Sequence, residues 1–192
     1  FGDKVKHLPL KSLGISTNLH EVQKSDLFRL WILGTEGGYY FDLDIIHIKP
    51  IESLNLTDNY VTICLRNGYH SIGALSANAG QRFFLDLFYA AKISLDYKQY
   101  QSAGSTLLTR DFPTVESITD KYPKLEIINL DYEAYYYYNF NRLQELFYEF
   151  HPEKLPEYVK GIHFYSGDIM TRKFMNEYRP TTQCTFNHLI KD

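Results

Sequence analysis

Two aspartates, Asp42 and Asp44, lie one residue apart in an otherwise apolar stretch, GTEGGYYFDLDIIHI at residues 34–48. The aromatic and β-branched residues of YYFDLDIIHI predict a strand. Since side chains alternate along a strand, both carboxylates are expected on one face. The opposite, core-facing side is then apolar: Phe41, Leu43 and Ile45. Adjacent carboxylates repel unless water screens them or a cation lies between them. They therefore line a solvated strand face, or they hold Mg²⁺ or Mn²⁺, which also binds diphosphate oxygens.

Asp26 and Arg29 lie three positions apart in NLHEVQKSDLFRLWILGTEGG, which predicts a helix that places them on one face. Gly37 and Gly38 supply its C-terminal stop, so the helix end and the following strand are expected to be close in space. A guanidinium group can grip a phosphate through two hydrogen bonds, and a carboxylate can accept them from sugar hydroxyls. The alternative is a surface ion pair that contributes little stability.

The segment SDLFRLWILGTEGGYYFDLD resembles the S-D-x-x-R … G-G-x-Y-x-D-x-D signature of glycosyltransferases with a DxD sugar-binding region. That family includes initiating α-1,6-mannosyltransferases, α-1,4-galactosyltransferases and the large glucosylating toxins. The matching positions are Ser25, Asp26, Arg29, Gly37, Gly38, Tyr40, Asp42 and Asp44. The resemblance implies an α/β fold, a GT-A-like Rossmann-type domain with a mixed sheet. It also implies a metal-dependent, retaining hexosyltransferase (EC 2.4 type) of glycan or polysaccharide biosynthesis.

The same resemblance implies roles for individual residues. The residues expected to bind the donor sugar nucleotide are Ser25, Asp26, Arg29 and Tyr40, with Arg29 near the diphosphate. Asp42 is expected to bind the ribose or sugar of the donor and a metal-bound water. Asp44 is expected to bind the cofactor, Mn²⁺ or Mg²⁺, directly. Asp42 and Asp44 are thus the candidate catalytic residues.

Three later segments resemble the family more weakly. In ALSANAGQRFFLDLF, Asn78 is expected near the donor sugar or acceptor, or else it is a turn or cap residue. AGSTLLTRDF resembles a Gly-Pro-x-x-Leu-Thr segment, with Ser105 in place of proline. GIHFYSGD resembles a histidine-containing turn, which makes His163 either a third metal ligand, favouring Mn²⁺ over Mg²⁺, or a structural histidine. Asp168 stands where the family commonly has serine, so it either binds the metal or weakens diphosphate binding.

The remaining pattern predicts the elements that position these residues. Strands are expected at YVTICL, LEIINL and GIHFY, and KPIESL is expected to form a turn. Helices are expected at QRFFLDLFYAAKISL, at GSTLLTRDF with a Ser or Thr cap, and at NRLQELFYEF. The first of these buries one face: Phe84, Leu87, Phe88 and Ala91. Alternating strands and helices predict an α/β domain with a mainly parallel or mixed sheet. The tyrosine run at 135–138 predicts sheet packing or a surface that stacks sugars.

The 192 residues are enough for one catalytic domain, 1–192, with a sizeable core. A net charge of −3 gives no indication of a nucleic-acid partner. Cys64 and Cys184 cannot form a disulfide framework or a cysteine zinc site, and we expect both to be separate and buried. No apolar run is long enough for a transmembrane segment. The chain is therefore expected in the cytoplasm, including the inner membrane face, or in the Golgi lumen if an upstream anchor has been removed.

Only 24 residues precede Ser25, whereas the family carries a βαβ-type segment there. The chain is thus expected to lack part of the N-terminal nucleotide-binding half. Two functions follow: transfer of a hexose from a UDP- or GDP-sugar to a glycan, lipid-linked or protein acceptor, or non-catalytic binding of a nucleotide sugar or glycan. A phosphatase with a D-x-D nucleophile fits poorly, because DLDIIHI is expected to continue as a strand and lacks the Thr or Val such enzymes need.

Overall fold

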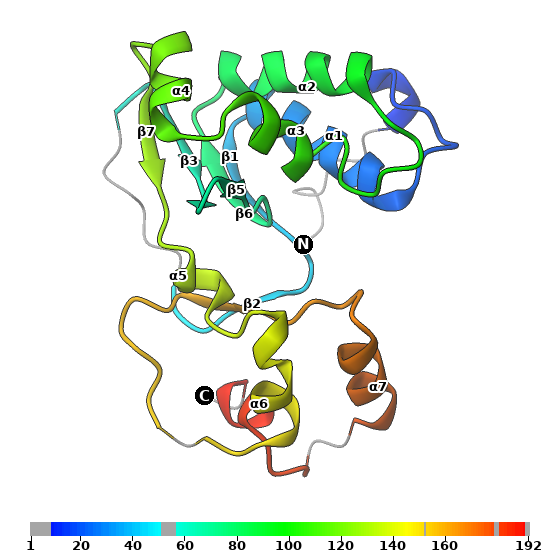
Figure 1. Cartoon of the computed structure of the whole chain (residues 1–192), viewed down its shortest axis with the longest axis vertical. Coiled ribbons are helices and arrows are strands. Elements are labelled where there is room, and N and C mark those ends of the chain that lie inside the picture. The colour runs from blue at the N-terminus through cyan, green and yellow to red at the C-terminus, as the bar shows by residue number, and fades with distance from the viewer. Residues whose placement is uncertain (1–8, 51–56, 152, 179–180, 191–192) are drawn as a thin grey trace, which may run out of the picture. The chain divides into compact units, whose positions relative to one another are not determined.

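The computed structural model describes residues 9–50, 57–151, 153–178 and 181–190. The chain divides into two compact units, each with its own apolar core (Figure 1). Among the described residues, the first unit comprises 9–40 and 57–129, and the second comprises 41–50, 130–151, 153–178 and 181–190. That the whole chain acts as a single catalytic domain stays a prediction.

The first unit contains a four-stranded mixed sheet in the order β1-β6-β3-β7. Its strands are β1 (Gly38–Phe41, whose last residue opens the second unit), β3 (Tyr60–Ile63), β6 (Ala74–Ala77) and β7 (Glu126–Asn129). Strand β3 runs antiparallel to β6 and parallel to β7. The hairpin β4 (Leu65–Arg66) and β5 (Tyr69–His70) forms a separate two-stranded sheet. The helices are η2 (Leu10–Leu13), α1 (Glu21–Thr35), α2 (Arg82–Ser94), α3 (Ser105–Asp111) and α4 (Val115–Lys121).

Helices α1 and α2 lie side by side and supply much of the first core (Figure 1). Gly34 permits this approach, because a Cβ there would lie 2.7 Å from the Leu85 Cγ atom. The predicted face of α2 is confirmed, since all four of its residues are buried: Phe84, Leu87, Phe88 and Ala91. Helix α1 ends as expected, with Gly37 and Gly38 at φ 68° and 90°, a backbone region that glycine adopts readily.

The second unit joins a two-stranded antiparallel sheet to short helices. The strands are β2 (Ile45–His47) and β8 (Gly161–His163), with Ile45 opposite His163. The helices are α5 (Glu133–Tyr136), η3 (Phe140–Arg142), α6 (Leu143–Tyr148), α7 (Ile169–Glu177) and α8 (Thr185–Leu189). Phe147 of α6 stacks on Phe174 of α7 with ring centroids 4.5 Å apart, at the centre of the second core.

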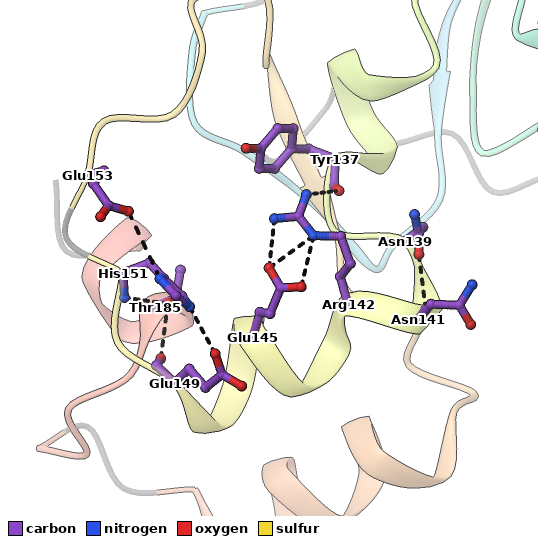
Figure 2. A network of polar contacts seen from close by, with 9 residues as sticks. All are labelled: Tyr137, Asn139, Asn141, Arg142, Glu145, Glu149, His151, Glu153 and Thr185. Atoms are coloured by element: carbon purple, nitrogen blue, oxygen red, sulfur yellow. Dashed lines mark hydrogen bonds and ion pairs between the residues drawn. The ribbon is translucent and has the colours of Figure 1, made fainter.

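Polar contacts fix both ends of α6 (Figure 2). At its start, Arg142 donates to both carboxylate oxygens of Glu145 and, at 3.1 Å, to the Tyr137 carbonyl. After its end, the Thr185 N–H group donates to the Glu149 carbonyl at 2.8 Å, which ties α6 to the start of α8. These contacts lie within the second unit and make α6 a fixed support for the elements around it.

The mixed sheet and the helices confirm the α/β class, whereas the finer GT-A assignment stays a prediction. The expected strands at YVTICL, LEIINL and GIHFY are present as β3, β7 and β8. One expectation is wrong, since the cap of α3 is Gly104 rather than Ser or Thr, and β6 was not expected. The tyrosine run overlaps helix α5, and its first two rings pack on the β2–β8 sheet, against His47 and His163. Most of the KPIESL turn lies outside the described residues.

Cys64 and Cys184 are buried and free, as expected, and each lies in a different unit. Within the described part of the chain, no helix has the length and apolar character that crossing a bilayer requires.

Candidate functional site

The two aspartates lie in a turn, which corrects the expected continuous strand. Strand β1 ends at Phe41, and β2 begins at Ile45. The Ile45 N–H group donates to the Asp42 carbonyl at 3.1 Å, closing a four-residue turn whose first position favours Asp. Leu43 is fully exposed at the tip instead of packing in the core. Side chains do not alternate between two faces here, because the backbone reverses within DLD.

The turn also removes one reason against a phosphatase. Asp42 directly follows a strand, so the expectation that the strand continues through DLDIIHI is wrong. The second reason remains, since Ile45 and Ile46 follow the pair where such an enzyme needs Thr or Val.

Asp42, Asp44 and His163 come together in the second unit, as the sequence predicted. One ligand atom from each lies within 4.8 Å of the other two. The pairing of Ile45 with His163 across β2 and β8 explains the approach, because Asp44 directly precedes Ile45. All three side chains are partly exposed, so a ligand can reach them.

The Asp44 carboxylate is held by groups from one loop. Its Oδ1 atom lies 3.0 Å from His163 Nε2, and its Oδ2 atom accepts from the Ser166 N–H group at 2.8 Å and hydroxyl at 2.9 Å. Burial raises the pKa of Asp44, but the hydrogen bonds from His163 and Ser166, together with the attraction to His163, outweigh it and lower the pKa to about 2. Asp44 is therefore ionised at ordinary pH, the state that binds a cation.

The His163 ring is held between two tyrosines. Its centroid lies 5.2 Å from that of Tyr136 and 4.0 Å from that of Tyr165. Because a carboxylate only accepts, the contact with Asp44 places the ring proton on Nε2, and a cation bound at Nε2 would require that proton to leave. Among the described residues, none hydrogen-bonds to the buried Nδ1 atom. The packing thus fixes the ring with Nε2 toward the aspartate pair.

The donor set fits a divalent cation. Ligands on opposite sides of an ion, each about 2.0–2.4 Å away, stand at most about 4.8 Å apart. The spacing of the three ligand atoms lies within that limit, so small movements would let them surround one ion. Two hard carboxylates with one imidazole suit Mn²⁺ and accept Mg²⁺.

Asp168 has a structural position. Its carboxylate accepts from the Met170 N–H group at 2.7 Å and caps the N-terminus of α7. Among the described residues, the candidate ligand cluster does not include it. The structure therefore gives no support to Asp168 as a further metal ligand.

Four predicted donor-binding residues form one polar cluster in the first unit. The Ser25 hydroxyl lies 2.9 Å from the Tyr40 hydroxyl, and the guanidinium group of Arg29 lies 4.6 Å from the centre of the Tyr40 ring. Arg29 Nη2 lies 3.2 Å from Asp26 Oδ1. The structure thus brings together the residues that the signature places on α1 and β1.

The pair at the centre of this cluster is buried, with Asp26 and Arg29 side chains 2% and 5% exposed. Arg29 Nη1 donates to the Ile72 carbonyl at 2.6 Å. Gly104 makes room for Asp26, since a Cβ there would lie 2.4 Å from Asp26 Oδ2. The alternative of a surface ion pair is therefore wrong: the pair is an internal link between α1, the chain before β6 and the start of α3.

Asn78 extends the sheet of the first unit. Its Oδ1 atom accepts from the Tyr60 N–H group at 2.6 Å, and its Nδ2 atom donates to the Thr57 carbonyl at 3.4 Å. A structural role is thus visible, and contact with a donor stays a prediction. Ser166 was not predicted, and the only signal was the SGD turn after His163, because a serine acting through its own N–H group leaves no spacing pattern.

Comparison with protein families gives one match. The model described as "Glycosyltransferase sugar-binding region containing DXD motif" matches residues 5–61. The resemblance found in the sequence is confirmed, because the matched residues include the whole segment that carries the signature. The family supports a transferase and usually binds a divalent metal, for which the Asp-Asp-His cluster is the candidate site. No curated protein and no solved structure matches the chain.

Proposed function

We propose that the chain is a divalent-metal-dependent glycosyltransferase that moves a hexose from a UDP- or GDP-sugar to an acceptor hydroxyl, with retention at the anomeric carbon. The observation that carries the proposal is the cluster of Asp42, Asp44 and His163, because its two aspartates are the DXD pair of the matched segment. The acceptor belongs to the class of glycans, lipid-linked sugars or proteins.

The second unit supplies the metal ligands in this proposal. Asp42, Asp44 and His163 hold the ion, Mn²⁺ in preference to Mg²⁺. When bound, the ion supplies positive charge that stabilises the departing nucleoside diphosphate. Asp44 needs no proton removed at neutral pH, since the pKa of its carboxyl group is held at about 2. The His163 ring packs against the tilted ring of Tyr165 with centroids 4.0 Å apart, which limits its motion.

The first unit supplies the donor-binding residues in this proposal. Ser25 and Tyr40 share a hydrogen bond and are half-buried, so each keeps surface for a ligand. Asp26 and Arg29 are buried, so in this proposal they act on the donor indirectly: Arg29 pairs with Asp26 and packs against the Tyr40 ring, which keeps Tyr40 in position. Asn78 completes the set from the end of β6.

The test is a panel of UDP- and GDP-hexoses with Mn²⁺, scored for release of the free sugar and for transfer to simple acceptors. The wild-type chain should turn over at least one donor. Asp44→Asn should lower turnover on the order of 10²-fold or more, because it removes a charged ligand of the ion. Asp168→Asn is the matched control and should retain turnover, since Asp168 caps α7.

Calorimetry separates the proposal from a non-catalytic binding module. A binder gives heat with a nucleotide sugar and Mn²⁺ but forms no product over any incubation. Equal turnover by the wild-type chain and Asp44→Asn would overturn the metal-dependent mechanism.

A further inference from the structure

Residues of the turn 164–168, between β8 and α7, and the preceding His163 contact Asp44. The Phe164 N–H group donates to the Asp44 carbonyl at 2.9 Å. The Ser166 N–H group and hydroxyl both donate to Asp44 Oδ2, at 2.8 and 2.9 Å. His163 meets the other carboxylate oxygen, Oδ1. One loop therefore binds the backbone and both carboxylate oxygens of a single candidate metal ligand.

The loop is anchored independently of Asp44. Tyr165 has φ 49°, a left-handed conformation uncommon for a residue with a side chain. The Asp168 N–H group donates to the Tyr165 carbonyl at 2.8 Å, which closes the turn. The hydroxyl of the fully buried Thr171 donates to the Phe164 carbonyl at 2.7 Å. Helix α7 thus holds Ser166 in place from the C-terminal side.

The two carboxylate oxygens of Asp44 differ in the number of hydrogen bonds they accept. An ionised carboxylate offers roughly two lone-pair directions on each oxygen. Ser166 donates two hydrogen bonds to Oδ2, whereas among the described residues only His163 lies within hydrogen-bond distance of Oδ1. Oδ1 would then be the oxygen available to a cation, and Asp44 would bind it through that one oxygen.

We propose that Ser166 is a positioning residue that restricts Asp44 to monodentate ligation through Oδ1 and so favours six-coordinate Mn²⁺ or Mg²⁺ over Ca²⁺. Ca²⁺ takes six to eight oxygens and often uses both oxygens of a carboxylate, whereas Mg²⁺ requires near-octahedral geometry. Partners that orient a ligand tune metal affinity in this way. The inference rests on the metal ligation in the proposed function and adds its selectivity.

The experiment measures binding of the metals alone to the full chain. The Mn²⁺ dissociation constant comes from the electron paramagnetic resonance signal of free Mn²⁺, and that of Ca²⁺ from competition with Mn²⁺. Ser166→Ala should weaken Mn²⁺ binding about tenfold and Ca²⁺ binding less, so the preference for Mn²⁺ falls. Ser166→Thr keeps the hydroxyl and should restore the preference. The control is Ser94→Ala, whose hydroxyl donates to the Ala90 carbonyl in the first unit.

Two results would overturn the role of Ser166. One is a ratio of Mn²⁺ to Ca²⁺ dissociation constants in Ser166→Ala that equals the wild-type ratio. The other is a Ser166→Thr variant that has the same ratio as Ser166→Ala although its melting temperature equals that of wild type. If Ser166→Ala does not fold, Ser166→Cys takes its place, because a thiol is a weak donor and should give an intermediate loss. A wild-type ratio in that variant would also reject the role.

Failure of the inference can be told apart from failure of the proposed function. A chain that binds Mn²⁺ selectively and loses that preference in Ser166→Ala, yet transfers no hexose, overturns the proposed function and supports the role of Ser166. If the wild-type chain transfers hexose with Mn²⁺, and Ser166→Ala keeps the wild-type ratio of Mn²⁺ to Ca²⁺ dissociation constants, the inference alone is overturned. A wild-type chain that binds neither ion overturns both the inference and the metal dependence.

Discussion

The polar cluster of the first unit pairs Asp26 with Arg29, and the ligand cluster of the second pairs Asp44 with His163. The two pairs differ in burial. The Asp26 and Arg29 side chains are 2% and 5% exposed, whereas those of Asp44 and His163 are 17% and 12% exposed. Arg29 also donates to the Ile72 carbonyl and the Ser25 hydroxyl and pairs with Asp26.

The difference in burial suits the two pairs to different roles, one in stability and the other in ligand binding. A buried ion pair with internal hydrogen bonds fixes the positions of the segments it joins, because breaking it leaves a charge without solvent. A partly exposed carboxylate with two hydrogen bonds at one oxygen and a single contact at the other can still offer the second oxygen to a ligand. We therefore expect changes in the first cluster to act mainly on stability and changes in the second mainly on metal binding.

The largest expected effect on stability is that of Arg29→Ala. It removes one partner of the buried pair, which should lower the free energy of unfolding by about 3–5 kcal/mol. Trp31, the only tryptophan, lies on α1 and packs against the first core, so its fluorescence during urea unfolding reports this unit. Mn²⁺ affinity of the folded variant should stay within about twofold of wild type. A large loss of Mn²⁺ affinity at full stability would break the comparison.

His163→Ala should have the reverse profile. It removes the only nitrogen ligand of the described cluster and one of the donors to Asp44, so Mn²⁺ affinity should fall about 10- to 100-fold. The Trp31 unfolding curve should not move, because the change lies in the second unit. Titration of Mn²⁺ with the same free-ion signal measures the first quantity. A shifted Trp31 curve with unchanged affinity would contradict the assignment.

Asp168→Ala tests whether Asp168 only caps α7 or also binds a metal ion. Loss of its bond to the Met170 N–H group should destabilise the second unit by about 1 kcal/mol, as for other N-cap aspartates. Melting followed by far-ultraviolet circular dichroism measures this change. Mn²⁺ affinity should remain close to wild type, and a tenfold loss would restore Asp168 as a metal ligand.

The sequence predicted the long elements better than the turns. Apolar periodicity located α1 and α2, and β-branched runs located β3 and β7, since burial of one face dominates in such segments. The reversal at Asp42–Asp44 was missed because its neighbours are strong strand formers on both sides. Strand β6 was missed because ALSA has small side chains and weak strand preference.

The candidate site was predictable where type and spacing carry the information. Asp42 and Asp44 were found from their spacing and from the family resemblance, His163 was found from the resemblance alone, and the structure brings the three together. Ser166 acts through one backbone and one side-chain donor, which depend on the turn conformation and not on sequence spacing. The burial of Arg29 depends on segments distant in sequence, near Ile72 and Gly104, which a local pattern cannot reveal.

The smallest expected effect is a pH dependence confined to the first unit. His70 is fully buried, and burial lowers its pKa below the usual value, partly offset by its 2.7 Å bond to the Phe112 carbonyl. As pH falls below about 6.5, the unfolded chain gains a proton at His70 that the folded chain resists, so unfolding becomes more favourable. The contribution of His70 to stability is thus greatest above pH 6.5 and declines on acidification.

His70→Gln keeps a donor for the Phe112 carbonyl but removes the titration. Between pH 8 and pH 5.5, the midpoint of Trp31-monitored thermal unfolding should fall less in this variant than in wild type. His188→Gln lies in the second unit and serves as the matched control, with a wild-type decline expected. Equal declines in His70→Gln and wild type would place the acid sensitivity of the first unit elsewhere. A smaller decline in His70→Gln alone would show that the first unit responds to pH through a buried histidine that lies outside the candidate metal site.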